Sequence, residues 1–208
     1  MRVKDGDHGQ ESGTLGLGRL CWIGFMLALA LGSCRESPVS PNGSEAFLGR
    51  TVFVTSATFT GSLGGIEVAD QVCTTLAGAA GLSGRFRAWL SDSSGLSPDE
   101  TFNQGNVPFV MTSGVRVADH WIDLTDGTIN NPIVVDEHGR QPDTVPVVWT
   151  GTTASGQGLT VDATCFGWSD ASAGVMGQVG EVDAIGPTWS SSRKAGCDQR
   201  GRLYCFQQ

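Results

Sequence analysis

Cysteine is the residue type whose number and spacing carry most of the chemistry in this 208-residue chain. Cys21 and Cys34 lie in or directly after an apolar N-terminal segment, and four more lie in the body of the chain: Cys73, Cys165, Cys197 and Cys205. No Cys-x-x-Cys pair occurs among them, which favours two disulfides over a metal site. Four cysteines permit three pairings, and the spacing leaves the choice open.

The segment before Cys34 has the pattern of an export signal. Residues 20–31 form an apolar run after Arg19, and about a dozen residues are too few to span a bilayer, which needs about 20. Leu31-Gly32-Ser33-Cys34 resembles the bacterial lipobox, in which the cysteine thiol is acylated and the chain is cut before it. We expect residues 1–33 to be a signal peptide and Cys34 to carry the lipid; the alternative is a secretory peptide cut elsewhere.

The residues on either side of this signal lack the composition of a folded core. Acids at positions 5, 7 and 11 do not suit the basic start of a signal peptide, so we expect translation to begin later, near Leu15 or Leu17. Residues 35–46 are rich in Pro, Ser, Gly and Glu, which favours an extended chain. Residues 34–46 are therefore expected to tether the folded part to a membrane.

Residues 47–208 have the length of one domain and enough apolar residues for a core. The whole chain has 30 glycines and a charged fraction of 16%, which indicates many turns and short strands. A net charge of −8 disfavours a nucleic-acid partner, which would favour a basic surface.

The pattern of apolar residues predicts one long helix and several short strands. Apolar residues recur at three- and four-residue steps over 66–80, so this segment is an amphipathic helix with Cys73 on its core side. Strands are expected at 51–55, 86–90, 107–111, 147–150 and 203–206, and one or two helical turns at 119–124. This order predicts an α+β domain.

Several of these segments resemble a known family in their residues and their order. The landmarks are Gly81–Ser91, Val107-Pro108, Val148–Gly151, Cys165, Cys197 and Leu203–Phe206. They resemble endostatin, and more closely the bacterial lipoproteins that carry an endostatin-like domain. The resemblance covers residues 51–208. It implies a C-type-lectin-like fold, with a twisted antiparallel sheet, two helices and long loops. It also implies that Cys73 pairs with Cys205, and Cys165 with Cys197.

Motifs for catalysis are not found in the sequence. There is no His-Glu-x-x-His, no Gly-x-Ser-x-Gly and no phosphate-binding glycine loop. His120 and His138 are expected to be surface histidines rather than zinc ligands. The zinc site of endostatin lies in a His-rich N-terminus, and residues 44–50 contain no histidine. We expect no enzymatic activity, no cofactor and no metal.

Gln141-Pro142-Asp143 matches the tripeptide with which C-type lectins bind galactose-type sugars through calcium. Side-chain oxygens on either side of a proline turn suit a hard cation and sugar hydroxyls. The tripeptide lies farther from Cys165 than that pattern expects, and Trp168-Ser169-Asp170 only loosely matches its companion motif. A simple proline turn before the strand at 147–150 is therefore the favoured interpretation.

Other candidate surfaces come from aromatic, basic and loop residues. The five tryptophans after residue 46 are expected in the core. Arg85 and Arg87 match the heparin-binding arginines of endostatin in type, but the acidic chain favours structural ion pairs. The glycine-rich run 169–187 lies between Cys165 and Cys197, and we expect it to be a surface loop that carries recognition.

Together these features predict a lipid-anchored binding or adhesion module on the bacterial cell envelope, most simply on the outer membrane. It would recognise a protein or glycan ligand and would contact the membrane through its lipid. The alternatives are a calcium-dependent carbohydrate-binding lectin and a structural envelope lipoprotein.

Overall fold

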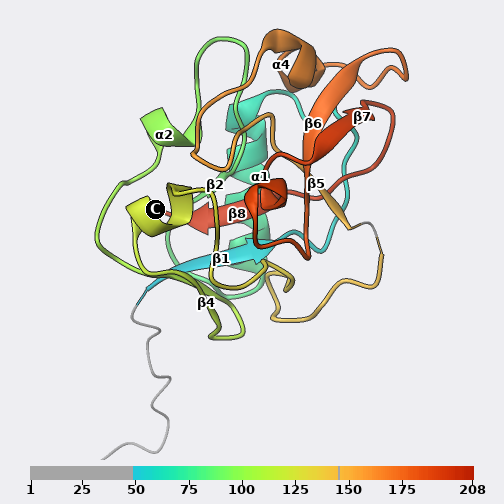
Figure 1. Cartoon of the computed structure of the whole chain (residues 1–208). Helices are drawn as coiled ribbons and strands as arrows, with labels where there is room; N and C mark the ends of the chain where they lie inside the picture. The colour runs from blue at the N-terminus through green and yellow to red at the C-terminus, as the bar shows by residue number, and fades with distance from the viewer. Residues whose placement is uncertain (1–48, 145) are drawn as a thin grey trace, which may run out of the picture. The chain divides into compact units, whose positions relative to one another are not determined.

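The computed structural model describes residues 49–144 and 146–208, which belong to a unit formed by residues 43–208 (Figure 1). The expected signal peptide, the expected lipidation site Cys34 and the expected tether up to residue 46 lie outside these residues. Among the residues that are described, no helix is long and apolar enough to cross a membrane.

The larger sheet has five strands in the order β2-β8-β1-β3-β4 (Figure 1). Its central strand β1 (Arg50–Val54) pairs antiparallel with β8 (Tyr204–Gln207) and parallel with β3 (Phe109–Met111). Strand β2 (Phe86–Ala88) lies on the outer side of β8, and β4 (Arg116–Ala118) lies beyond β3.

Both faces of this sheet are buried, because successive side chains of a strand point to opposite faces and those of β1 and β8 enter two different hydrophobic clusters. Val52 and Val54 of β1 enter one hydrophobic cluster, while Phe53 between them enters the other. Strand β8 repeats the pattern, with Tyr204 and Phe206 in the first cluster and Cys205 in the second.

The smaller sheet has three antiparallel strands in the order β5-β6-β7. Strand β6 (Met176–Glu181) lies between β5 (Val147–Trp149) and β7 (Arg193–Gly196). The expectation of a surface loop over residues 169–187 is wrong for Met176–Glu181, which form β6. Gly177 to Gly180 are buried, and Val179 packs in the core.

Helix α1 (Ile66–Ala79) covers one face of the larger sheet. Ala69, Cys73 and Ala77 are its buried residues, spaced four apart, and they pack in the cluster that contains Phe53 and Phe86. The helix ends before Gly81, which has a φ of 79° that glycine adopts without strain.

The remaining helices are single turns that connect the strands. They are α2 (Pro98–Thr101), α3 (Trp121–Thr125), α4 (Cys165–Trp168) and two 3₁₀ turns, η1 (Val161–Ala163) and η2 (Pro187–Trp189). The domain is thus α+β, with two sheets and few helices.

Two disulfides join distant parts of this domain, in the pairing that the family resemblance implies. Cys73 of α1 bonds Cys205 of β8, with Cα atoms 5.4 Å apart, and Cys165 bonds Cys197, with Cα atoms 5.8 Å apart.

All five tryptophans of the described residues are buried, so the expectation that they form core is confirmed. The exposed fractions of these residues lie between 0% and 7%. These tryptophans are Trp89, Trp121, Trp149, Trp168 and Trp189.

Candidate binding site

The turn Gln141–Thr144 lies between two hollows of about 340 Å³ each. All four residues of the turn line both hollows, and Arg202 lines both as well. Gln141, Asp143 and Thr144 are exposed, so their polar groups are open to a ligand. The structure therefore places the tripeptide singled out in the sequence at a concave surface.

Arg202 holds this turn through hydrogen bonds and is only 4% exposed. Its Nη1 donates to the carbonyl oxygens of Thr55, at 2.7 Å, and Ser56, at 2.6 Å, just after β1. Its Nε donates to the carbonyl of Thr144 at 3.1 Å, and its Nη2 donates to the same oxygen. One planar guanidinium thus joins the turn to the end of the central strand.

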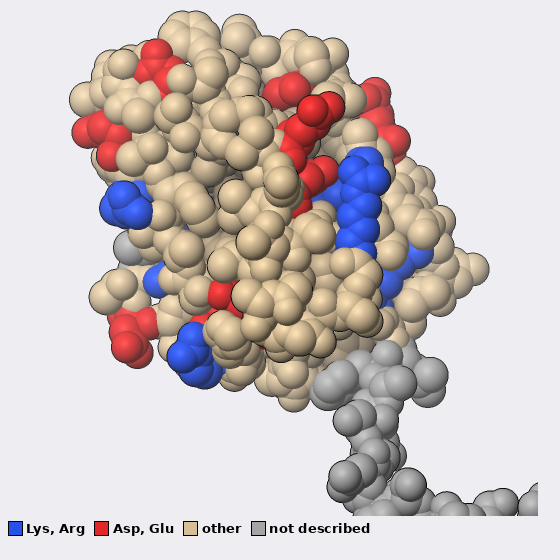
Figure 2. Space-filling view, turned by 180° about the vertical axis from the view of Figure 1, so that it is seen from behind, with Lys and Arg blue, Asp and Glu red and all other residues tan. Residues whose placement is uncertain are grey.

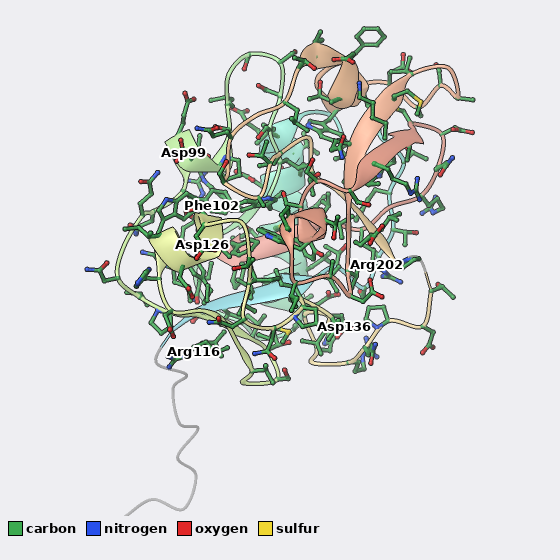
Figure 3. The ribbon with its side chains drawn as sticks, in the orientation of Figure 1. Asp99, Phe102, Arg116, Asp126, Asp136 and Arg202 are labelled. Atoms are coloured by element: carbon green, nitrogen blue, oxygen red, sulfur yellow. A yellow bond between two sulfur atoms is a disulfide. The ribbon has the colours of Figure 1, made fainter. Side chains whose placement is uncertain are left out.

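Two buried carboxylates lie beside this arginine, which Figure 3 shows near Asp136. Asp136 accepts hydrogen bonds from the backbone N–H groups of His138 and Arg140, each at 2.9 Å, and pairs with the Arg140 guanidinium at 3.1 Å. Glu137 accepts from the Ser56 N–H at 2.9 Å. Burial lowers the pKa of Arg202, and the charges of Asp136 and Glu137 oppose that shift.

The two hollows differ in their linings. The first has apolar walls from Val134, Pro142, Pro146 and Val182, and the acidic residues Asp143 and Asp183 also line it. The second is polar, because Ser56, Asp136 and Arg140 join the turn residues and Arg202 around it. The site therefore offers an apolar surface and several hydrogen-bonding groups on a backbone that buried contacts hold.

The residues that the calcium-lectin interpretation would add to the turn are elsewhere in the domain. Trp168 and Asp170 lie at and just after α4, and neither lines these hollows. Trp168 is buried, with its indole N–H bound to the Ser91 carbonyl at 2.8 Å. Among the described residues, no group of three or more His, Cys, Asp or Glu side chains is placed to hold a metal.

The two histidines of the described residues, His120 and His138, have different surroundings. His120 precedes α3, and its Nδ1 accepts a hydrogen bond from the Asp123 N–H at 3.1 Å, so it caps that helix. His138 is exposed, with its Nε2 3.9 Å from a carboxylate oxygen of Glu137.

Helix α4 is a left-handed turn that the sequence did not reveal. Cys165, Phe166 and Trp168 have φ angles of 48°, 52° and 62°, and Gly167 between them has 67°. Left-handed conformations strain non-glycine residues, and runs of them are rare. The turn is held by Trp168 N–H donating to the Thr164 carbonyl at 2.7 Å and by the Cys165–Cys197 disulfide. The only sequence signal for a positive φ in this segment is Gly167.

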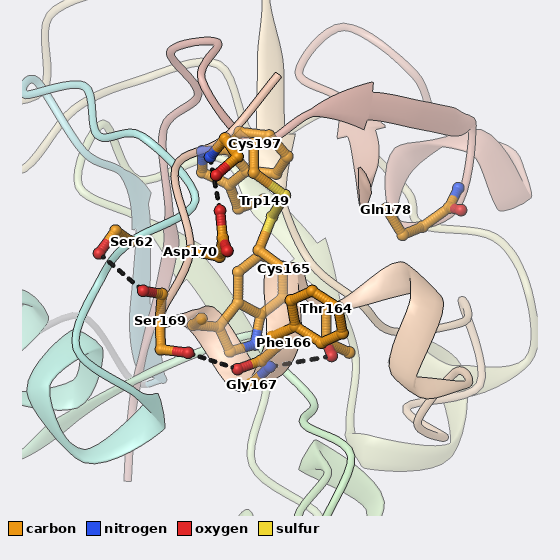
Figure 4. The surroundings of a disulfide bond; sticks show 12 residues. Ser62, Trp149, Thr164, Cys165, Phe166, Gly167, Ser169, Asp170, Gln178 and Cys197 are labelled. Atoms are coloured by element: carbon orange, nitrogen blue, oxygen red, sulfur yellow. Dashed lines mark hydrogen bonds between the residues drawn. A yellow bond between two sulfur atoms is a disulfide. The ribbon is translucent and has the colours of Figure 1, made fainter. Parts of the chain in front are cut away.

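Figure 4 shows this turn beside the Cys165–Cys197 disulfide, with Phe166 labelled. Phe166 is 59% exposed and lines a shallow hollow of about 260 Å³ with Val161 and Met176. The disulfide itself is enclosed: a Cβ atom on Gly61 or Gly177 would lie 2.3 or 2.7 Å from the Cys165 Sγ. Both glycines are therefore needed where the chain approaches the sulfur.

Charged side chains do not form a basic face in the view of Figure 2, where basic and acidic residues lie in small mixed groups. The expected ion pairing of the arginines near β2 is found for Arg87. Its Nε lies 3.6 Å from a carboxylate oxygen of Asp70, and its Nη1 donates to the Thr101 carbonyl at 2.8 Å.

No protein-family model matches this chain, and no curated protein sequence shows significant similarity to it.

Proposed function

We propose that this chain is a lipid-anchored protein of the bacterial cell envelope whose C-type-lectin-like domain binds a protein or glycan ligand without transforming it. The binding surface is the turn Gln141–Thr144 with its two hollows. The observation that carries the proposal is the burial of Arg202, which holds an exposed polar turn against the end of β1. Binding groups on a rigidly held loop are typical of recognition modules.

The fold proposal is supported by the arrangement of the disulfides. A helix tied to the last strand by Cys73–Cys205, with a second disulfide closing the Cys165–Cys197 loop, is what the endostatin-like resemblance implies. Two disulfides also suit an exported protein, because they form and persist in oxidising compartments.

The lipid anchor depends on the sequence Leu31-Gly32-Ser33-Cys34. Mass spectrometry of the native protein tests it through the N-terminal peptide. A diacylglycerol thioether on Cys34 supports the anchor, whereas an uncleaved chain with a free Cys34 thiol contradicts it.

A calcium-dependent lectin is the second candidate, and one observation favours it. Gln141 and Asp143 are both exposed at the hollows, so their side-chain oxygens are open to a cation and a sugar. Calcium prefers six to eight oxygen ligands, and backbone carbonyls and the ligand itself can supply some of them.

A binding screen separates these candidates. The full chain, in a neutral detergent, is applied to arrays of glycans and of extracellular matrix proteins, with calcium and with a chelator. The main proposal expects a ligand whose signal does not depend on calcium and falls in a Gln141→Ala/Asp143→Asn variant. Loss of a glycan signal on chelation favours the lectin instead. A screen with no ligand on either array contradicts both.

A further inference from the structure

The first hollow combines an apolar wall with negative charge. Val134, Pro142, Pro146 and Val182 supply carbon surface, and the acidic residues Asp143 and Asp183, both exposed, belong to the same lining. At about 340 Å³ the hollow has room for a long side chain, and it is open to solvent.

The positive charges nearby are already balanced. Arg202 binds the backbone carbonyls of Thr55, Ser56 and Thr144 and interacts with the buried carboxylates of Asp136 and Glu137. Arg140, on the rim of the neighbouring hollow, pairs with Asp136 at 3.1 Å. These contacts leave the first hollow with a net negative lining.

Throughout residues 49–144 and 146–208, the side chains of Asp143 and Asp183, the two acidic residues of this hollow, neither accept a hydrogen bond nor form an ion pair. The charge of Asp183 does reach the neighbouring core: burial chiefly, and after it the charges of Asp183 and Glu181, raise the pKa of the Tyr204 hydroxyl.

We propose that this hollow receives a lysine or arginine side chain of a partner protein. The methylene groups of such a side chain would pack against the valines and prolines, while its cationic end would reach Asp143 and Asp183. This inference rests on the proposed function and selects a protein ligand over a glycan. A neutral sugar would leave both carboxylates without a cation, so charge complementarity favours the basic side chain.

Amide chemical shifts of the ¹⁵N-labelled full chain in neutral detergent test this directly. The probes are N-acetyl-arginine amide, N-acetyl-lysine amide and N-acetyl-citrulline amide, which has nearly the shape of arginine and no charge. We expect the two basic probes to shift the amides of Val134, Asp143 and Asp183 in a saturable way, and citrulline to shift them at least several-fold more weakly.

Three variants complete the test. Asp143→Asn and Asp183→Asn should each lower the affinity for the arginine probe by about two- to fivefold, as expected for a solvent-accessible ion pair. Asp198→Asn is the matched control, since Asp198 is exposed and lies outside this hollow, and it should leave the affinity unchanged. Unchanged shifts of amides far from the hollow would show that the variants keep the fold.

Equal binding of citrulline and arginine, or equal losses in all three variants, would overturn the inference. So would basic probes that shift no amide of the hollow. If in that case an array ligand still shifts the amides of Gln141–Thr144, the proposed function stands without the basic partner. If no array ligand shifts them either, the proposed function fails too.

Discussion

Arg202 is the residue on which the candidate site most depends. It comes from the segment just before β8, yet it binds carbonyl oxygens after β1 and in the turn Gln141–Thr144. Asp136 and Glu137, each 3% exposed, have their charges next to it. Removing the guanidinium would leave buried carboxylates and carbonyls with fewer partners, a situation that costs free energy in proportion to burial.

The first prediction concerns this arginine. Arg202→Gln should lower the free energy of unfolding by about 3–5 kcal/mol, because it removes one partner from a buried set of charges. Arg116→Gln is the control: its ion pair with Asp119 is exposed and should contribute less than about 1 kcal/mol. Denaturant unfolding with the disulfides intact measures both. Equal losses in the two variants would show that Arg202 does not organise the turn.

Asp70 leads to a prediction about pH. Burial raises the pKa of its carboxyl, and a hydrogen bond from the Ala88 N–H and the charge of Arg87 only partly oppose this. A carboxyl whose pKa is raised by folding stabilises the native state while protonated, and this contribution is lost as the pH rises through the raised pKa. Asp70→Asn should therefore gain stability relative to the wild type between pH 3 and pH 7. A constant difference across this range would contradict the stated pKa direction.

At the scale of elements, the molecule combines regular strands with two local departures. Strand β6 is the centre of the smaller sheet, although its sequence is rich in glycine. Helix α4 is left-handed over consecutive non-glycine residues. Such strain persists only where the surroundings impose it. Here the surroundings are the disulfide of Cys165 and the buried indole of Trp168. The left-handed turn allows both side chains to be buried.

The strain of α4 can be measured at Phe166. Phe166→Gly should leave stability unchanged or raise it, since relief of the left-handed conformation offsets the larger conformational freedom of glycine in the unfolded chain. Ile122→Gly is the control, because Ile122 is exposed in the right-handed helix α3 and should lose about 0.5–1 kcal/mol. A larger loss for Phe166→Gly than for Ile122→Gly would show that the turn is not strained.

The glycines of β6 explain how this strand packs. A Cβ on Gly180 would lie 2.0 Å from the carbonyl oxygen of Trp189, so Gly180→Ala should destabilise the fold by about 1–3 kcal/mol. Gly174→Ala should have little effect, because no atom lies within 4 Å of the Cβ position there. Thermal unfolding compares the two variants, and equal melting temperatures would contradict the close approach of β6 to η2.

The sequence predicted the elements whose signals are local. The three- and four-residue steps around Cys73 located α1, and the β-branched run at 51–55 located β1. The left-handed α4 could not be foreseen, because it depends on the disulfide to Cys197, 32 residues along the chain, and on the close approach of Gly177 in β6. The role of Arg202 was missed for the same reason, whereas the proline at 142 did mark the turn that Arg202 holds.

At the scale of the whole described domain, two disulfides and two hydrophobic clusters hold the strands around the site. The chain-entropy model assigns about 5 kcal/mol to Cys73–Cys205 and about 4 kcal/mol to Cys165–Cys197, as upper values, for sequence separations of 132 and 32 residues. Either value is comparable to the whole net stability of a small domain. The exposed turn Gln141–Thr144 is thus attached to a scaffold that can remain fixed while a ligand binds.

Hydrogen–deuterium exchange of the full chain, alone and with the strongest ligand from the arrays, locates the ligand on the domain. We expect slower exchange in peptides covering residues 134–146 and 181–183, and no change in peptides covering α4 and residues 170–176. Protection confined to the Phe166 region, or a ligand that protects neither region, would contradict the assignment of the binding surface to the turn beside Arg202.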